Sequence, residues 1–201
     1  MPAGRHDDGL VRCAWADAYQ GAGSALYRDY HDHEWGRPVR DRTGLFERVS
    51  LEAFQSGLSW LVILRKREDF RRAFSGFDVE AVARYGDADV ARLMDDATIV
   101  RNRAKIAATI ANARAVVELG SIDLGELLWS FGPPPRPRPA DPSAIAPTTP
   151  ESTAMARELK RRGFRFVGPV TAYALMQATG MVDDHMRDCW VPPITREDHK
   201  N

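Results

Sequence analysis

Hydrophobic positions recur at helical spacing along most of the chain, and the stretch from 43 to 56 shows the pattern most clearly. Its sequence, TGLFERVSLEAFQS, places Leu45, Val49 and Glu52 on one stripe of a helix. A carboxylate is therefore aimed in the same direction as two apolar side chains. The pattern predicts a helix that carries Glu52 toward the interior of the protein.

Capping residues set the limits of this helix, and the same hydrophobic spacing predicts others. Thr43 is a suitable N-cap for it, and Gly57 is a suitable stop. Similar patterns predict helices over 67–75, 78–84, 87–96, 102–119, 123–130, 151–163 and 170–180. Gly163 and Gly180 end the last two of these. Because hairpin-turn dipeptides and long alternating runs are scarce, we expect a mainly α fold.

Two segments fall outside this helical pattern. Residues 132–150, GPPPRPRPADPSAIAPTTP, contain too many prolines for a helix or a central strand, so we expect a connector or surface loop. Residues 1–10, MPAGRHDDGL, lack the apolar core of a signal peptide and are interpreted as a polar tail. We expect a single domain over 11–190 and a second tail over 191–201.

The composition is that of an ordinary globular protein. The 201 residues are 44% hydrophobic and 28% charged, which is enough material for one good core. No apolar stretch approaches the roughly 20 residues that a membrane span requires. We therefore expect no membrane segment and a cytoplasmic location.

The charge balance gives no simple argument for binding nucleic acid. The chain has 28 basic and 28 acidic residues, so its formal net charge is zero. The basic residues nevertheless gather in three groups, which are Arg65, Lys66, Arg67, Arg71 and Arg72; Arg101, Arg103 and Lys105; and Arg157, Lys160, Arg161, Arg162 and Arg165. If the groups share a face they could neutralise DNA phosphates; otherwise they are solvated helix faces.

The cysteines and histidines suggest a metal site. The chain has two cysteines, Cys13 and Cys189, and a disulfide between them is disfavoured in a reducing cytoplasm. His185 and Cys189 lie four residues apart, which on a helix would put both on one face and allow them to bind one ion. Cys13 and His31 could complete a closed shell typical of structural zinc.

Other interpretations of these residues stay open. His33 and His199 compete as ligands, and the two thiols could equally be inert groups in the core. If the metal site forms, it joins the beginning of the domain to its end.

Glu52 also allows two interpretations. A buried carboxylate needs a partner, and one of the many arginines could provide it in a core ion pair. The alternative is a recognition role, because several aromatic residues lie near it in the sequence. These are Trp15, Tyr27, Tyr30, Trp35 and Trp60. Aromatic rings together with an anion make a good pocket for a flat cation, although they also make an ordinary core.

A helix-turn-helix pattern covers residues 91–113, ARLMDDATIVRNRAKIAATIANA. A short turn followed by a basic helix N-terminus can hold a DNA phosphate. Arg101 and Lys105 are the candidate phosphate contacts, and Lys105 is also a candidate amine nucleophile.

Several of these segments together resemble the DNA-3-methyladenine glycosylase I family. The resemblance covers nearly everything between Cys13 and Cys189. Its most specific parts are the strings YHDHEWGRP and LEAFQSGLSW, which occur in order and at family-like spacing. The further matching segments are CAWA at 13–16, LRKREDFRRAF at 64–74, RNRAKI at 101–106 and the stretch from 148 to 185.

The resemblance implies a helix-hairpin-helix glycosylase fold with a zinc-binding subdomain formed by 11–35 and 181–190. It also implies that the enzyme flips 3-methyladenine out of double-stranded DNA and removes it. We expect the protein to be a monomer. The family's structural zinc ligands fall on Cys13, His31, His185 and Cys189. Its catalytic recognition glutamate falls on Glu52, and its aromatic pocket on Trp15, Tyr27, Tyr30 and Trp60.

The chain departs from the family pattern in a few places. Thr98 stands where the hairpin usually has glycine, and a β-branched residue is poor at positive φ. The residues before Val11 and the proline repeat at 133–139 have no clear family counterpart. Gly57 and Leu58 follow the Glu52 helix and are candidates for the wedge that fills the gap in the duplex.

Three other functions are compatible with parts of the sequence. A glycosylase with lyase activity would use Lys105 as its amine. A zinc-dependent hydrolase would use the HDHE and DDH strings as ligands, although two cysteines favour closed coordination. A DNA-binding module would lack chemistry altogether.

Overall fold

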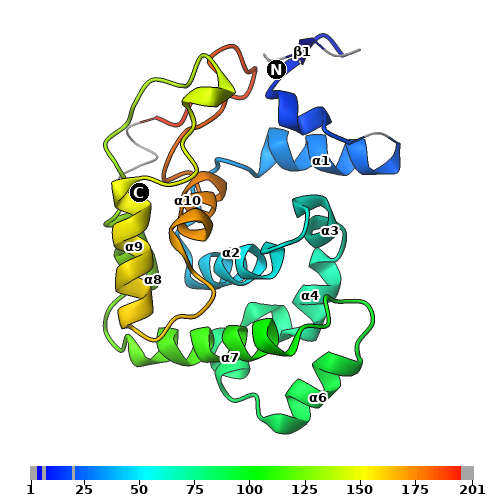
Figure 1. Cartoon of the computed structure of the whole chain (residues 1–201), viewed down its shortest axis with the longest axis vertical. Helices are drawn as coiled ribbons and strands as arrows, with labels where there is room; N and C mark the ends of the chain where they lie inside the picture. The colour runs from blue at the N-terminus through cyan, green and yellow to red at the C-terminus, as the bar shows by residue number, and fades with distance from the viewer. Residues whose placement is uncertain (1–3, 6–7, 20, 196–201) are drawn as a thin grey trace.

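The computed structural model describes residues 4–5, 8–19 and 21–195, and Figure 1 shows that nearly all of its regular structure is helical. The α-helices are α1 Ala22–His33, α2 Arg42–Gln55, α3 Trp60–Arg65, α4 Arg67–Ala73, α5 Val79–Ala83, α6 Asp87–Asp95, α7 Arg103–Glu118, α8 Leu124–Trp129, α9 Pro150–Arg161 and α10 Pro169–Ala178. The short 3-10 helices are η1 Ala14–Asp17, η2 Ser75–Phe77 and η3 Pro142–Ala144. Strands β1 Gly4–Arg5 and β2 Val11–Arg12 form one antiparallel pair. The mainly α expectation is confirmed.

Helix α2 lies at the centre of the molecule. Figure 1 shows it surrounded by other helices, and it contacts α3, α7, α8 and α10. Every residue from Leu45 to Phe54 is buried, including the polar side chains of Ser50 and Glu52. Because α2 has no solvent face over this length, its carboxylate cannot escape to water, as the hydrophobic stripe predicted.

The two ends of α2 explain how Glu52 is placed. The N-cap is Asp41 and not Thr43, because the Asp41 carboxylate accepts a hydrogen bond of 2.8 Å from the backbone N–H of Gly44. The helix ends at Gln55, and Gly57 follows with a φ of 78°, which glycine adopts without strain. The turn leaves Leu58 exposed beside the end of the helix.

A helix occupies each of the predicted ranges, with ends that differ by one or two residues. Two helices, α1 and α3, were not predicted. Helix α1 begins after Gly21 without a side-chain cap, and α3, which follows Ser59, has only six residues, too few for a helical pattern to be recognised.

An early segment of the chain, around Val11, lies beside a late one, around Trp190. The backbone N–H of Trp190 donates to the carbonyl of Val11 at 2.8 Å, and Val191 is buried. The expected tails are therefore shorter than predicted: Gly4–Arg5 pairs with β2, and Asp8 forms a salt bridge with Arg12. None of the described helices is both long and apolar enough to cross a membrane.

Candidate functional site

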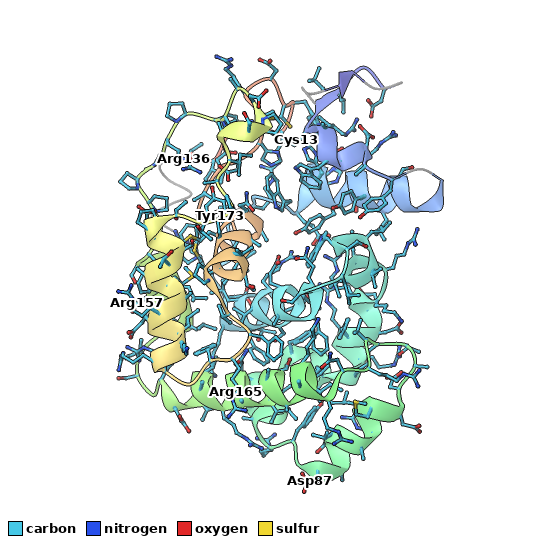
Figure 2. All side chains as sticks on the ribbon, viewed as in Figure 1. Cys13, Asp87, Arg136, Arg157, Arg165 and Tyr173 are labelled. Atoms are coloured by element: carbon cyan, nitrogen blue, oxygen red, sulfur yellow. The ribbon has the colours of Figure 1, made fainter. Side chains whose placement is uncertain are left out.

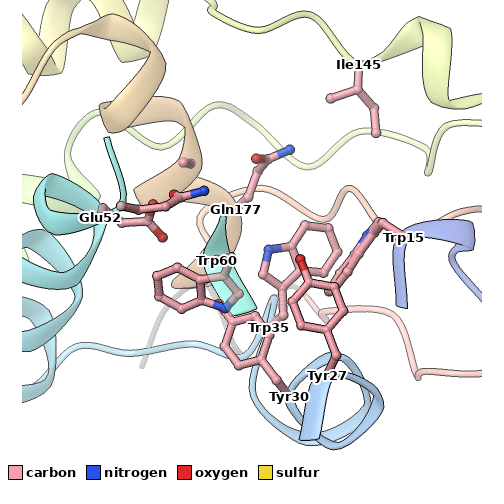
Figure 3. A pocket seen from close by; sticks show the side chains of 10 residues that line it. Trp15, Tyr27, Tyr30, Trp35, Glu52, Trp60, Ile145 and Gln177 are labelled. Atoms are coloured by element: carbon pink, nitrogen blue, oxygen red, sulfur yellow. The ribbon is translucent and has the colours of Figure 1, made fainter. Parts of the chain in front are cut away.

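A cavity of about 240 Å³ opens between α1, α2, α3 and α10, and Figure 3 shows the side chains around it. Its lining residues are Trp15, Tyr27, Tyr30, Trp35, Glu52, Gln55, Trp60, Ile145, Ala174 and Gln177. All five residues that the sequence assigned to a base pocket line this one cavity, and Trp35 joins them. Sequence reasoning missed the residues from α10 and from the proline-rich loop, because they are far away in the chain.

The aromatic walls of the cavity hold one another in place. Trp15 packs edge-on against Tyr27 with ring centroids 5.3 Å apart, and against Trp35 at 4.9 Å. Tyr30 and Trp60 lie 5.3 Å apart with their rings tilted by 44°. Such edge-to-face contacts fix ring orientation, so the pocket presents preformed flat surfaces to a ligand. Burial raises the pKa of Tyr27 to about 12, which keeps its phenol neutral.

Glu52 enters the cavity from α2 without a protein partner. Only 5% of the residue is exposed, and no described side chain or backbone group donates a hydrogen bond to its carboxylate or forms a salt bridge with it. Burial raises the pKa of Glu52 to about 8, and the nearby Arg48 opposes this shift. The cavity therefore contains an acidic group whose charged form would be stabilised by a bound cation.

The core ion pair that was considered for Glu52 is not formed. Arg48 lies one helical turn before Glu52, but its Nη2 donates to Glu34 at 3.0 Å. Arg67 binds the same Glu34 carboxylate with both terminal nitrogens, at 2.5 and 2.7 Å. These two guanidinium groups hold the pKa of Glu34 below its ordinary value although burial opposes them. The arginine charge nearest to Glu52 thus already has a partner.

A second cluster joins the two ends of the chain. The ligand atoms of Cys13, His31, His185 and Cys189 all lie within 4.8 Å of one another, and all four residues are buried. The Cys189 sulfur lies 3.5 Å from His185 Nδ1 and 3.6 Å from His31 Nε2, and the Cys13 sulfur lies 3.6 Å from His185 Nδ1. Bonds of about 2.0–2.3 Å to a tetrahedral ion separate its ligands by roughly 3.3–3.8 Å. The cluster therefore fits a metal ion.

Neighbouring groups orient the two imidazoles for this role. The His31 Nδ1 faces the Asp32 carboxylate at 2.7 Å, which leaves Nε2 for the metal. The His185 Nε2 lies 3.2 Å from the carbonyl oxygen of Trp35, which leaves Nδ1 of that ring for the metal. Gly36 is needed beside it, since its φ is 75° and a Cβ there would lie 3.1 Å from His185 Nε2.

The route by which the ligands meet differs from the prediction. His185 and Cys189 do not share a helix, because residues 183–195, which follow α10, are irregular apart from a turn at 187–188. A turn hydrogen bond from the Cys189 N–H to the Met186 carbonyl, 2.9 Å long, brings the pair together instead. His33 is exposed and faces Asp29, so it takes no part in the cluster. His199 lies outside the described residues.

The α6–α7 hairpin, which contains most of 91–113, does not present both basic residues as expected. Lys105 is buried, and its Nζ donates to the carbonyls of Phe54 and Ser56 at 2.8 and 2.5 Å. It satisfies the C-terminal carbonyls of α2 and does not line the cavity. Arg101 is exposed, as a phosphate contact requires.

Thr98 is accommodated in this hairpin without backbone strain. Its φ is not among the positive values of the described residues, and its backbone N–H and hydroxyl both donate to the Asp96 carboxylate. Lys66 donates to its carbonyl at 2.7 Å. Thr98 therefore needs no glycine-like backbone conformation in this turn.

Helices α9 and α10 form a second hairpin, which the sequence analysis did not single out although the hairpin carries the third basic group. The turn GFRFVGP leads into α10, whose N-cap Gly168 supplies no side-chain hydrogen bond. Arg157 and Arg165, both labelled in Figure 2, line a hollow beside this helix start together with Lys160. Free backbone N–H groups surrounded by basic side chains suit an anion. The glycines flanking the turn were the available signal.

Comparison with known proteins agrees with this geometry. Residues 20–192 match the family described as Methyladenine glycosylase. DNA-3-methyladenine glycosylase 1 of Escherichia coli (strain K12) is 41% identical over 188 residues, which cover 92% of this chain and 98% of that protein.

Solved structures show the same fold. A crystal structure of 3-methyladenine DNA glycosylase I is 42% identical, with a TM-score of 0.84 over 90% of this chain and 100% of that one. The Staphylococcus aureus enzyme, whose structure concerns the recognition of 3-methyladenine, is 34% identical with a TM-score of 0.83, over 90% of this chain and 97% of that one. In both sequence and fold, over most of its length, this chain belongs to the methyladenine glycosylase family.

Proposed function

We propose that this protein is a monofunctional DNA glycosylase, which hydrolyses the N-glycosidic bond of 3-methyladenine in double-stranded DNA. The products are the free base and an abasic site. The observation that carries the proposal is the buried Glu52 carboxylate, which has no protein partner and opens into a cavity of aromatic rings. Such a cavity is complementary to a flat cation.

The chemistry of the substrate explains why so little catalytic machinery is needed. Methylation at N3 makes the adenine ring cationic, so the base can leave as a neutral molecule without a strong general acid. As the bond from the sugar to the base breaks, a water oxygen adds to the sugar and releases a proton. The enzyme must chiefly extrude the nucleotide from the stack, which takes a few kcal/mol, and hold the base.

Each pocket residue has a role in holding the base. Glu52 accepts hydrogen bonds from it and stabilises its charge, and Tyr30 fixes its edge. Trp15 and Trp60 supply stacking surfaces, with Tyr27 completing the wall. A neutral adenine in the same place would leave the Glu52 carboxylate unpaired, which is unfavourable in a buried site. The pocket therefore discriminates by charge as well as by shape.

The three other functions fit the structure less well. Lyase chemistry needs an amine in the cavity, and Lys105 is held elsewhere by two carbonyls. A zinc hydrolase needs an open coordination position, whereas four protein ligands close the shell. A module that only binds DNA would need no partnerless buried carboxylate.

Product analysis tests these functions together. The protein is incubated with methylated duplex DNA, and we expect free 3-methyladenine and unbroken strands that carry abasic sites. Strand breaks at those sites would indicate lyase activity. Absence of any released base would overturn the proposed function.

We propose that the metal is one structural Zn²⁺ per chain, held by Cys13, His31, His185 and Cys189. Two thiolates and two imidazoles form a shell that zinc prefers. Bound there, zinc supplies a structural cross-link rather than a catalytic group. A reducing cytoplasm would keep both thiols available as ligands. One chain builds the whole base pocket, which supports a monomer as the active unit.

The proposed DNA surface includes the start of α10. From Pro169 to Gln177 the helix rises about 12 Å at roughly 1.5 Å per residue, so one helix links the anion site to the base pocket. Successive phosphates of one strand are separated by about 3.4 Å along the duplex axis, so this span is a few base steps. Arg101 is a further phosphate contact, and the exposed Leu58 is the proposed wedge.

The salt dependence of DNA binding identifies the phosphate contacts. Arg165→Ala and Arg101→Ala should each weaken binding to all sequences alike, and each should reduce the slope of log K against log salt by about one. Lys105→Met should leave the slope unchanged and lower the melting temperature instead, because two α2 carbonyls lose their donor. Fluorescence anisotropy over a salt series measures the slopes. Wild-type slopes in both arginine variants would remove those side chains from the interface.

The raised pKa of Glu52 predicts a pH dependence of stability. Its pKa is about 8 in the folded protein against 4.5 ordinarily, so the folded state binds more protons between these values. Wild-type stability should therefore fall as pH rises through this window, relative to Glu52→Gln. Melting temperatures of both proteins across the window measure the difference. A constant difference would mean that Glu52 titrates normally.

A further inference from the structure

Gln177 is a polar group of the base pocket to which the mechanism above gives no role. It lies on α10 and lines the cavity. Figure 3 shows the Gln177 side chain between Glu52 on one side and Tyr27 and Trp15 on the other. The Gln177 Nε2 donates a hydrogen bond of 2.9 Å to Asp184 Oδ2. The amide is therefore anchored from behind.

Asp184 determines which way this amide faces. Its side chain is 1% exposed, and its Oδ1 accepts from Arg136 Nη2 at 2.8 Å. The Tyr173 hydroxyl donates to Oδ2 at 2.6 Å. A carboxylate paired with a guanidinium can only accept, so it must face the NH₂ of Gln177. The carboxamide cannot exchange its two ends without placing its oxygen against the carboxylate.

The consequence is an acceptor aimed away from Asp184. No described residue donates a hydrogen bond to Gln177 Oε1, just as none donates to the Glu52 carboxylate. Glu52 and Gln177 thus both offer acceptor atoms that have no protein donor, whereas the donors of the lining lie on other residues, such as the unpartnered indole N–H of Trp60. The complement of these two acceptors is a base edge that carries N–H groups. Adenine has an amino group at C6, whereas guanine has a carbonyl oxygen there.

We propose that Gln177 is a specificity-determining residue, whose Oε1 accepts a hydrogen bond from the exocyclic amino group of the flipped base and disfavours a carbonyl at that position. Asp184 is the positioning residue, and Arg136 holds it. This inference rests on the proposed function. It extends the selection for positive charge to a selection for 3-methyladenine over 3-methylguanine, two bases that are both cationic in DNA.

The proline-rich loop gains a role from this arrangement. Arg136 and Arg138 stand two residues apart in its PPPRPRP sequence, which favours a stiff extended backbone. Arg138 donates to Asp183 Oδ2 at 2.8 Å and to the Val191 carbonyl at 2.7 Å. The loop is therefore tied to the segment that follows α10, and it carries Arg136 to Asp184.

Base preference tests the proposal directly. Duplex DNA containing both 3-methyladenine and 3-methylguanine is treated with wild type and with Gln177→Met, which keeps length and removes the acceptor. In Gln177→Met, the rate of 3-methyladenine release divided by the rate of 3-methylguanine release should fall about tenfold or more. The reason is that only 3-methyladenine loses a hydrogen bond, one that its charge strengthens. An unchanged ratio, whether or not both rates fall, would overturn the proposal.

A matched control comes from the other glutamine of the pocket. Gln55 lines the same cavity from α2, and no described group fixes its amide. Gln55→Met should leave the ratio of the two rates at the wild-type value. If wild type releases neither base, the proposed function fails. If wild type is active but Gln177→Met keeps its preference, only the present inference fails.

A double-mutant cycle separates positioning from structure. In Asp184→Asn the partner can donate as well as accept, so the Gln177 amide is no longer held one way round. The ratio should fall in this variant, with no further fall when it is combined with Gln177→Met. Zinc content and melting temperature are measured alongside because His185 is adjacent. Arg136→Gln replaces Asp184→Asn if that variant does not fold. If the two substitutions instead had independent, additive effects on the ratio, Asp184 would not act through Gln177.

Discussion

Replacing Glu52 with glutamine should lower the rate of 3-methyladenine release by roughly one to three powers of ten. The substitution keeps the shape of the side chain and most of its hydrogen-bonding capacity. It removes the negative charge that a cationic base would meet among the aromatic walls of the cavity. A hydrogen bond to a charged group is worth about 1.5–3 kcal/mol, and each 1.4 kcal/mol or so is a tenfold change in rate.

The same substitution should not destabilise the protein. The Glu52 carboxylate has no partner to lose, and burial already opposes its ionisation. Glu47 provides a matched control on the same helix, since it is also buried but binds Arg71 at 2.8 Å. Glu47→Gln should lower the melting temperature without changing base preference.

Melting and excision are best measured on the same preparations. A Glu52→Gln protein that melts early, yet excises at the normal rate below its transition, would show that the carboxylate is structural. The lack of a salt bridge to Arg48 argues for the opposite result.

Local pattern was sufficient to predict what lies within one helix. The stripe through Leu45 and Val49 placed Glu52 inside, because α2 is a regular helix buried on every side. The resemblance to the family supplied the roles of distant residues, and the structure brings those residues together in one cavity and one metal cluster. Pattern and resemblance therefore contributed different parts of the site.

The features that were missed depend on contacts between distant segments. Lys105 lies in the first turn of α7, after the N-cap Asn102, and was expected to contact a DNA phosphate. Its ammonium is instead buried, because it donates a hydrogen bond to the Ser56 carbonyl just after α2. Nothing in the local sequence around 105 reveals that carbonyl. Likewise, the orientation of Gln177 depends on Arg136, which comes from a loop 41 residues earlier in the chain. Tertiary packing overrides local propensity at such points.

Removing a metal ligand should have the largest effect on stability. Cys189→Ser should yield protein without tightly bound zinc, and its free energy of unfolding should fall by several kcal/mol, because metal binding contributes directly to folding. At about 2–4 °C per kcal/mol for a chain of this size, the melting temperature should drop by roughly 10 °C. Elemental analysis and calorimetry measure the two effects.

His33→Asn is the matched control for this loss. His33 lies two residues after His31 on α1, but it is exposed and faces Asp29, so its replacement should change neither zinc content nor melting. The pocket should also respond to the loss of metal, since the Trp15 ring packs 5.0 Å from His31 and the His185 imidazole contacts the Trp35 carbonyl. Base binding, followed by tryptophan fluorescence, should therefore weaken in Cys189→Ser even below its melting transition. Wild-type protein that contains no zinc when freshly purified would contradict the metal assignment, whereas zinc retained in Cys189→Ser would remove that thiolate from the site.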